Sequence, residues 1–328
     1  MSLASETMNV KTRVELLQPG LVLLRVGVLI LIMLLGDRLG ATYSLQLRTG
    51  NLLVYAEAPV SDKLKESLAK LDERVDKMQM DLGLYTENQA ALYLVKDHNS
   101  YQRLSLGKAK IVEFSEAFYS GKEGRIYIRP PLEIKESFTN TVMHEYIHWY
   151  LEEFFRDAPL WFHEGMATQY SGQMGFERYL YFLQQSFLGE SSDLFRMSYR
   201  YPEKQEDWQI FYLSSSMAVR FMSEKKEHEW RRFWSIASDT KHRGEKALFR
   251  ECFSMAYRNN AYDFHRQFAA YIKKLRYQYL FWGLNSLLAV SLPLVVIIGF
   301  HRRRRRMAAM PEYPEPVDEE EDTGDRGD

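Results

Sequence analysis

The segment HEYIH, residues 144–148, contains residue types at a spacing that could bind a metal ion. His144 and His148 are four positions apart, so on a helix they lie on the same face and can bind one ion together. Glu145 stands next to the first histidine, where its carboxylate can reach a water on that ion. The segment therefore predicts a metal-binding helix that also carries a general base.

A third candidate ligand, Glu164, occurs in the segment PLWFHEGMA. It lies sixteen positions after His148, beyond the break at residues 157–159 (DAP), which can end one helix and let a second return against it. Two imidazoles and one carboxylate leave the fourth tetrahedral position of Zn²⁺ open for water, as in a catalytic site. His163 points about 100° away from Glu164 on a helix, so we expect it to be structural.

The elements around these residues are strands first and helices afterwards, which predicts an α+β fold with an N-terminal mixed sheet and a helical C-terminal lobe. Period-two and helical spacing, together with the Gly and Pro breaks, define the elements before the metal-binding segment. They are a β-hairpin over 43–57, a helix from Ser61 to Gly83, a strand over 91–95, a short helix near Tyr101, and a strand pair over 110–114 and 125–129.

The strand 125–129 would bind an extended substrate backbone if it lies at the sheet edge beside the cleft. Residues 170–212 are rich in Tyr, Phe, Gln and Ser, and they shape the cleft or cover the core. Residues 230–275 have apolar positions at helical spacing and complete the helical lobe.

Two apolar segments flank this domain and predict a membrane protein. Residues 279–300 are 22 positions without a charge, and a helix of that length rises about 33 Å, enough to cross a bilayer core. A buried helix of a soluble protein is the alternative. His301 and five arginines at 302–306 follow, and the positive-inside rule places them in the cytoplasm.

The first apolar segment, residues 21–36, is interrupted by Arg25. We favour an uncleaved signal anchor after a cytoplasmic N-terminus at 1–20, and a signal peptide remains open. Either interpretation anchors the protein in the cell membrane and puts residues 37–278 on its extracytoplasmic side. These residues are enough for one sizeable domain or two small lobes. The bilayer itself is therefore an expected partner.

The composition limits the other classes of function. The net charge of −1 combines −8 over residues 307–328, +5 over 302–306 and +2 elsewhere, so no nucleic-acid-binding surface is indicated. Cys252 is the only cysteine, which excludes an intrachain disulfide framework and a thiolate-based zinc finger. The acidic, proline-punctuated end of the tail 301–328 is expected to be disordered and could bind a cytoplasmic partner.

HEYIH followed by WFHEGMA resembles the gluzincin zinc metallopeptidases, and within them the peptidase-MA-like branch, in which a Trp-x-x-Glu-Gly-x-Ala segment supplies the third ligand. The resemblance covers residues 45–275 and implies a zincin-like domain that hydrolyses a peptide or protein substrate. It implies that His144, His148 and Glu164 bind one Zn²⁺ and that Glu145 is the general base. It also implies that Tyr212 stabilises the oxyanion.

Two positions depart from the pattern of that group. Thr168 stands where relatives usually have an acidic residue that orients the first histidine, and a weaker partner of this kind costs about 10- to 100-fold in metal affinity or activity. The Gly-x-Met-Glu-Asn signature of the aminopeptidase branch is absent.

The sequence thus predicts a membrane-anchored zinc endopeptidase. A membrane-tethered binding or scaffold protein on an inactive peptidase fold is the first alternative, and a zinc site for non-peptide hydrolysis is the second.

Overall fold

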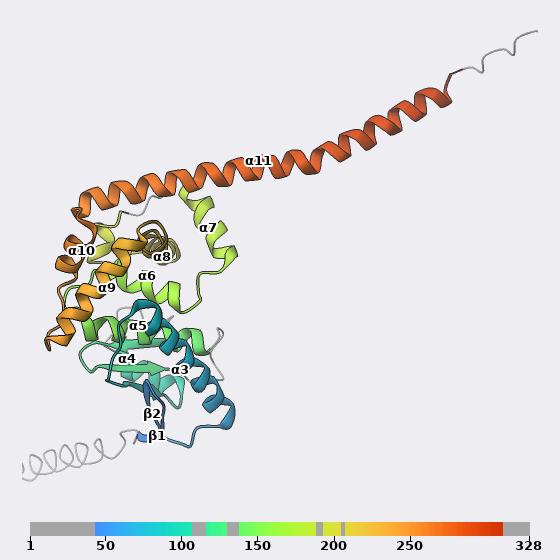
Figure 1. Cartoon of the computed structure of the whole chain (residues 1–328). Coiled ribbons are helices and arrows are strands. Elements are labelled where there is room, and N and C mark those ends of the chain that lie inside the picture. The colour runs from blue at the N-terminus through green and yellow to red at the C-terminus, as the bar shows by residue number, and fades with distance from the viewer. Residues whose placement is uncertain (1–42, 107–115, 130–137, 188–192, 205–206, 311–328) are drawn as a thin grey trace, which may run out of the picture. The chain divides into compact units, whose positions relative to one another are not determined.

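The computed structural model describes residues 43–106, 116–129, 138–187, 193–204 and 207–310 (Figure 1). It separates into two compact units, one built from residues up to Phe182 and from Ser192 to His265, the other from Leu183–Ser191 and from Arg266 onward. The strands are β1 (Ser44–Arg48), β2 (Leu52–Ala56), β3 (Ala90–Leu94), β4 (Ala117–Ser120) and β5 (Arg125–Ile128). The helices before the metal-binding segment are α3 (Asp62–Leu82) and α4 (His98–Ser105).

The five strands form one mixed sheet in the order β1-β2-β3-β5-β4. The pairs β1–β2 and β4–β5 are antiparallel, whereas β2–β3 and β3–β5 are parallel. The α+β class, the mixed sheet and the hairpin over 43–57 are therefore confirmed. The order leaves β4 at one edge of the sheet.

Helix α3 begins and ends where its capping residues predict. The Ser61 hydroxyl accepts a hydrogen bond from the backbone N–H of Leu64, and Gly83 closes the helix with a φ of 64°. The hairpin turn is attached to this helix, because the Asp72 carboxylate accepts hydrogen bonds from the Thr49 hydroxyl at 2.7 Å and the Asn51 backbone N–H at 2.9 Å. These contacts fix the first two strands against α3.

The predicted strand pair is only half correct. β5 lies within the predicted 125–129 strand, but its antiparallel partner is Ala117–Ser120, and residues 110–114 lie outside the described part of the chain. The condition under which 125–129 would bind a substrate backbone, a position at the sheet edge, is not met, because β5 lies between β3 and β4. Its run of buried side chains at Ile126, Tyr127 and Ile128 is typical of an interior strand.

Helices make up the rest of the first unit and pack around an aromatic core. Phe162 lies 4.7 Å from Phe249 between ring centroids, and Phe155 lies 5.3 Å from Phe233. The helical lobe predicted after the sheet is therefore present. Its helices are α5 (Phe138–Phe154), α6 (Leu160–Tyr170), α7 (Phe176–Phe187), the 3-10 helix η2 (Arg196–Ser198), α8 (Trp208–Lys225), α9 (Glu227–His242), α10 (Phe249–Tyr257) and the start of α11 (Ala261–Ala308).

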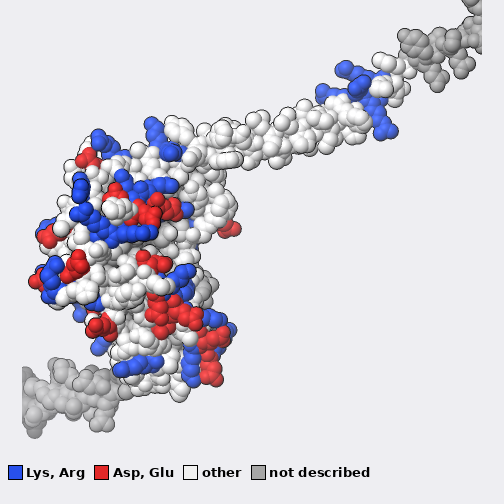
Figure 2. All heavy atoms as spheres, in the orientation of Figure 1, with Lys and Arg blue, Asp and Glu red and all other residues white. Residues whose placement is uncertain are grey.

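The second unit contains most of α11, which has 48 residues. Among the residues that the structure describes, α11 is the one helix that is both long enough and apolar enough to span a membrane. None of its most apolar stretch is buried. Figure 2 shows this stretch as an uncharged length that ends in the arginines at 302–306. The predicted segment 21–36 lies outside the described residues, so α11 is the one candidate span in the described part of the chain.

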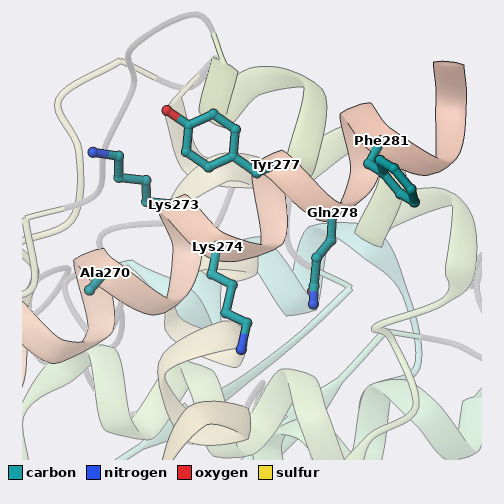
Figure 3. Close-up of a pocket in the computed structure, with 6 residues that line it drawn as sticks. All are labelled: Ala270, Lys273, Lys274, Tyr277, Gln278 and Phe281. Carbon is teal, nitrogen blue, oxygen red and sulfur yellow. The ribbon is translucent and has the colours of Figure 1, made fainter.

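A hollow runs along α11 where its apolar stretch begins (Figure 3). Along the helix the two lysines precede Tyr277, and Phe281 lies at the far end of the hollow. The side chains that line it are Ala270, Lys273, Lys274, Tyr277, Gln278 and Phe281.

Candidate metal centre

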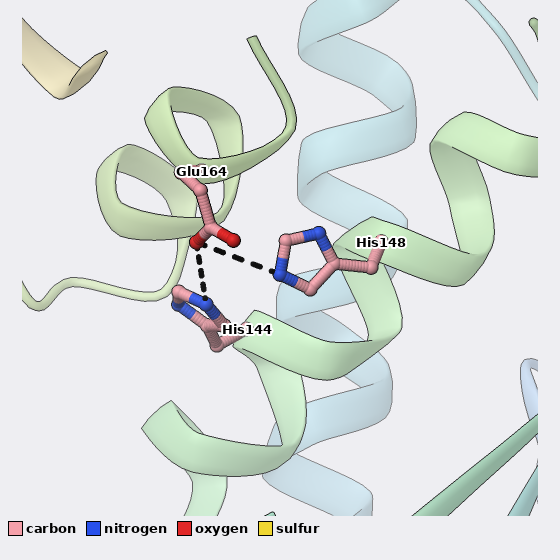
Figure 4. Close-up of side chains that lie close together, drawn as sticks. All are labelled: His144, His148 and Glu164. Atoms are coloured by element: carbon pink, nitrogen blue, oxygen red, sulfur yellow. Dashed lines mark ion pairs between the residues drawn. The ribbon is translucent and has the colours of Figure 1, made fainter. Parts of the chain in front are cut away.

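The three predicted ligands meet where α5 and α6 lie side by side (Figure 4). Oε2 of Glu164 lies 3.3 Å from Nε2 of His144 and 3.7 Å from Nε2 of His148. All three ligand atoms lie within 4.8 Å of one another. The sequence prediction of a His-His-Glu group close enough to bind one metal ion is therefore confirmed.

The two distances from Glu164 to the imidazole nitrogens fit a small tetrahedral ion. Two ligand atoms that each lie about 2.0–2.1 Å from such an ion are about 3.3 Å apart, close to both distances from Glu164. Glu164 is 1% exposed, and its Oε2 faces the two Nε2 atoms and has no other partner within the described residues. Two imidazole nitrogens and one carboxylate oxygen are donors that Zn²⁺ accepts, so the donor set fits a cation.

The turn between the two helices is fixed by the chain 90 residues further on. α5 ends at Phe154 and α6 begins after Pro159. The carbonyl of Phe154 accepts a hydrogen bond of 2.8 Å from the N–H of Ala247, and the Asp157 carboxylate accepts one from the N–H of Phe249. The proline break therefore reverses the chain as predicted and sets Glu164 opposite the histidines.

Gly165, next to the third ligand, permits the close approach of α6 to α8. A Cβ atom at this position would lie 2.3 Å from the carbonyl oxygen of Ser215 and 2.7 Å from a methyl group of Val219. The same approach brings Tyr212 of α8 to 6.3 Å from His144 between ring centroids. Close helix packing therefore explains why residue 165 is a glycine. The same packing positions Tyr212 beside the metal ligands.

The ligands border a cavity of about 280 Å³. Both residues predicted to be catalytic, Glu145 and Tyr212, lie in its wall. The remaining lining residues come from the β4 segment and from the helical lobe; the full set is Ala117, Phe118, Tyr119, Gly121, His144, Glu145, His148, Glu152, Leu160, His163, Glu164, Tyr201 and Tyr212.

Burial and charge separate the protonation states of the four central groups. Burial raises the pKa of Glu145 to about 7, against the opposing charge of His144. Burial lowers the pKa of His148 to about 3. Burial alone would lower the pKa of His144, but the hydrogen bond and charge of Glu164 raise it overall. Burial works against ionisation of Glu164, but the two histidines and Tyr201 lower its pKa to about 2.

Tyr201 is a residue of this site that the sequence did not reveal. Its hydroxyl donates a short hydrogen bond to Oε1 of Glu164, and its ring packs 5.5 Å from that of Phe211. Tyr201 lies in a segment between η2 and α8 without helical or strand spacing, so only the aromatic composition of residues 170–212 pointed to it.

His163 lies closer to the site than its position on α6 suggested. Its ring stacks on that of His148 at 5.7 Å between centroids, and it lines the cavity. Burial lowers its pKa to about 4, so it faces His148 as a neutral ring. His163 is therefore part of the cavity wall, although it is not one of the three grouped ligands.

Thr168 does not provide the hydrogen bond to His144 that an acidic residue at this position would provide. Its hydroxyl is buried and has no hydrogen-bond partner in the described part of the chain, and the same is true of Nδ1 of His144. The Gln173 side chain contributes a small upward shift to the pKa of His144, yet it forms no hydrogen bond of normal geometry with Nδ1. The first histidine is therefore held mainly by helix packing.

Comparison of the chain with known protein families and with curated proteins finds no match.

Proposed function

We propose that this protein is a membrane-anchored, zinc-dependent endopeptidase that acts outside the cytoplasm. The observation that carries the proposal is the convergence of His144, His148 and Glu164 in one cavity that also contains the Glu145 carboxylate. A binding protein has no physical need for a buried carboxylate beside two imidazoles, whereas hydrolysis needs a proton acceptor at that place.

Zinc is the proposed ion because two imidazoles and one carboxylate leave an open coordination position. Bound there, Zn²⁺ would polarise the scissile carbonyl and lower the pKa of a water to about 7. Glu145 takes the proton from the attacking water and delivers it to the leaving amide nitrogen. Its position supports this role, since Glu145 lies in the cavity wall next to His144, where its carboxylate can reach a bound water.

Tyr212 is proposed to donate a hydrogen bond to the oxygen that becomes negative when water attacks. Its support is its place in the cavity wall, with its ring beside that of His144. Burial is the largest cause that raises the pKa of Tyr212 above its ordinary value, so the hydroxyl keeps its proton for donation.

The outer edge of β4, which pairs with no further strand among the described residues, is proposed to bind the substrate backbone, in place of the 125–129 strand. Three of its residues, Ala117, Phe118 and Tyr119, line the cavity. A hydrogen bond involving the Tyr119 backbone opposes the rise in the pKa of Glu145, so this edge is close to the general base. An extended peptide could therefore pair with β4 and bring a peptide bond to Glu145.

The membrane anchor is proposed to be residues 279–300 of α11. Their length matches a bilayer core, and the arginines at 302–306 favour a cytoplasmic C-terminal end. The catalytic unit precedes this span, so it would lie on the opposite side of the membrane.

A second candidate is a membrane-tethered binding protein with little or no catalytic activity. Two buried polar atoms favour it. Neither Nδ1 of His144 nor the hydroxyl of Thr168 has a hydrogen-bond partner among the described residues. A histidine ligand without an orienting partner binds metal less tightly.

The full chain in detergent, loaded with zinc, tests the two candidates against a peptide library. We expect Glu145→Gln to retain its zinc and to lose about 10²- to 10⁴-fold in hydrolysis. The matched control is Glu153→Gln on the same helix, because Glu153 bonds Asn88 and does not line the cavity. Bound zinc without any Glu145-dependent cleavage would favour the binding protein.

A further inference from the structure

Glu152 is a cavity-lining carboxylate that neither the metal group nor the proposed hydrolysis uses. It follows His148 by four positions on α5, so the two side chains lie on the same face of the helix. Its distance along the helix axis is about 6 Å from His148 and about 12 Å from His144. The cavity wall therefore continues from the ligands to a second acidic group.

Two residues of the β4 segment hold this carboxylate in place. The Tyr119 hydroxyl donates a hydrogen bond of 2.8 Å to Oε2 of Glu152. A Cβ atom on Gly121 would lie 2.9 Å from Oε1 and 3.0 Å from Oε2, so a glycine leaves room for the carboxylate against the chain. Glu152 is thus fixed beside the edge strand β4.

No cation neutralises Glu152 within the part of the chain that the structure describes. The residues that line the cavity include neither lysine nor arginine. Lys246 is close, but its ammonium group donates to the backbone carbonyl of Glu152 at 2.6 Å and forms no ion pair with the carboxylate. A carboxylate has about four acceptor positions, and Tyr119 occupies one, so the others can accept hydrogen bonds from a ligand.

We propose that Glu152 determines substrate specificity by binding the positively charged side chain of a lysine or arginine near the scissile bond. The proposal rests on the peptidase function proposed above. The α-amino group of the residue that carries the reacting carbonyl lies within about 4 Å of that carbonyl, whereas an extended lysine or arginine side chain reaches up to about 6–7 Å from its Cα. The one helical turn from His148 to Glu152, about 6 Å along the axis, matches the longer reach.

The first test compares two N-acetylated peptides that differ only in lysine against norleucine, placed in turn at each position around the cleaved bond. With the full-length, zinc-loaded protein we expect kcat/KM to favour lysine by about 10- to 100-fold at one position. The ratio should fall towards one in Glu152→Gln and below one in Glu152→Lys, because a second positive charge repels lysine. Glu153→Gln, the neighbouring glutamate outside the cavity wall, should keep the ratio of the wild type.

The second test measures binding of the same fluorescent peptides to the Glu145→Gln chain by anisotropy, which requires no hydrolysis. We expect the lysine peptide to bind about tenfold more tightly, and a second change, Glu152→Gln, to remove the difference. If the lysine peptide binds more tightly but the wild-type chain cleaves neither peptide, the specificity is supported and the peptidase function is contradicted. Cleavage or binding without a preference for lysine, or a preference that Glu152→Gln leaves intact, would overturn the proposal for Glu152.

Discussion

The hydroxyl of Tyr201 donates a hydrogen bond to Oε1 of Glu164, a residue 37 positions earlier in the chain. The bond occupies one oxygen of the carboxylate and leaves Oε2 beside Nε2 of His144 and of His148. Tyr201 therefore determines which oxygen faces the metal position. Side chains that are hydrogen-bonded to a metal ligand often have this role in metalloproteins.

Removal of that hydroxyl should weaken metal binding. We expect Tyr201→Phe to lower zinc affinity by about 10- to 100-fold, because Glu164 loses the partner that orients it. Competition with a chromogenic chelator measures the affinity. The control is Tyr199→Phe, since Tyr199 is 87% exposed, and its affinity should equal that of the wild type. Equal affinities for all three proteins would contradict the positioning role.

A methyl group at residue 165 should force α6 and α8 apart. Gly165→Ala would place its Cβ against the Ser215 carbonyl oxygen, and overpacking of this kind typically costs about 1–3 kcal/mol. Thermal unfolding of the purified chain should show a lower Tm. Gly175→Ala has no atom within 4 Å of the added Cβ and should change Tm little. An unaltered Tm for Gly165→Ala would mean that the two helices are not in this close contact.

Metal binding should release one proton from the ligands at mildly acidic pH. His148 has its pKa lowered to about 3 and is neutral at pH 6, whereas the raised pKa of His144 keeps this imidazole protonated beside Glu164. A metal ion must displace that proton, so zinc affinity should fall as pH decreases through the pKa of His144. Calorimetry in buffers of different ionisation enthalpy measures the release.

The Glu145→Gln chain is the right material for that experiment, because the pKa of Glu145 is about 7 and its proton would be released as well. We expect about one proton per zinc at pH 6, where a zinc-bound water with a pKa of about 7 adds little. Release of two protons would show that His148 is also protonated in the metal-free protein.

The proposed topology predicts opposite labelling of two engineered cysteines. Native Cys252 is 1% exposed and should not react, so the positions Tyr199 and Met310, which are 87% and 70% exposed, can be tested one at a time. A membrane-impermeant maleimide should label Tyr199→Cys in intact cells and Met310→Cys only after permeabilisation. The reverse pattern would invert the orientation inferred from the arginines.

Local chemistry explains why the sequence predicts parts of this fold well. Ser61 and Gly83 define α3 because capping depends on neighbouring backbone groups, and Pro159 marks the start of α6 for the same reason. The four-residue spacing of His144 and His148 requires only a helix. These features involve contacts within a few positions of the chain.

The errors arise where contacts are distant in the sequence. The order of strands depends on pairing between separate segments. Nothing in residues 125–129 indicated that residues 117–120 would pair with them on the side away from β3. His163 does point away from Glu164 around α6, but the crossing of α5 brings His148 to that side. Tyr201 has no spacing relation to Glu164 at all, since a segment without regular structure carries it.

The metal content of purified protein tests the central claim most directly. After zinc loading and dialysis of the full-length chain, mass spectrometry of the metal should find one zinc ion per chain. Glu164→Ala and His148→Ala, each confirmed as folded by circular dichroism, should retain almost none. A wild-type chain that binds no zinc, or a Glu164→Ala chain that binds it as tightly as the wild type, would contradict the claim that these three side chains form one metal site.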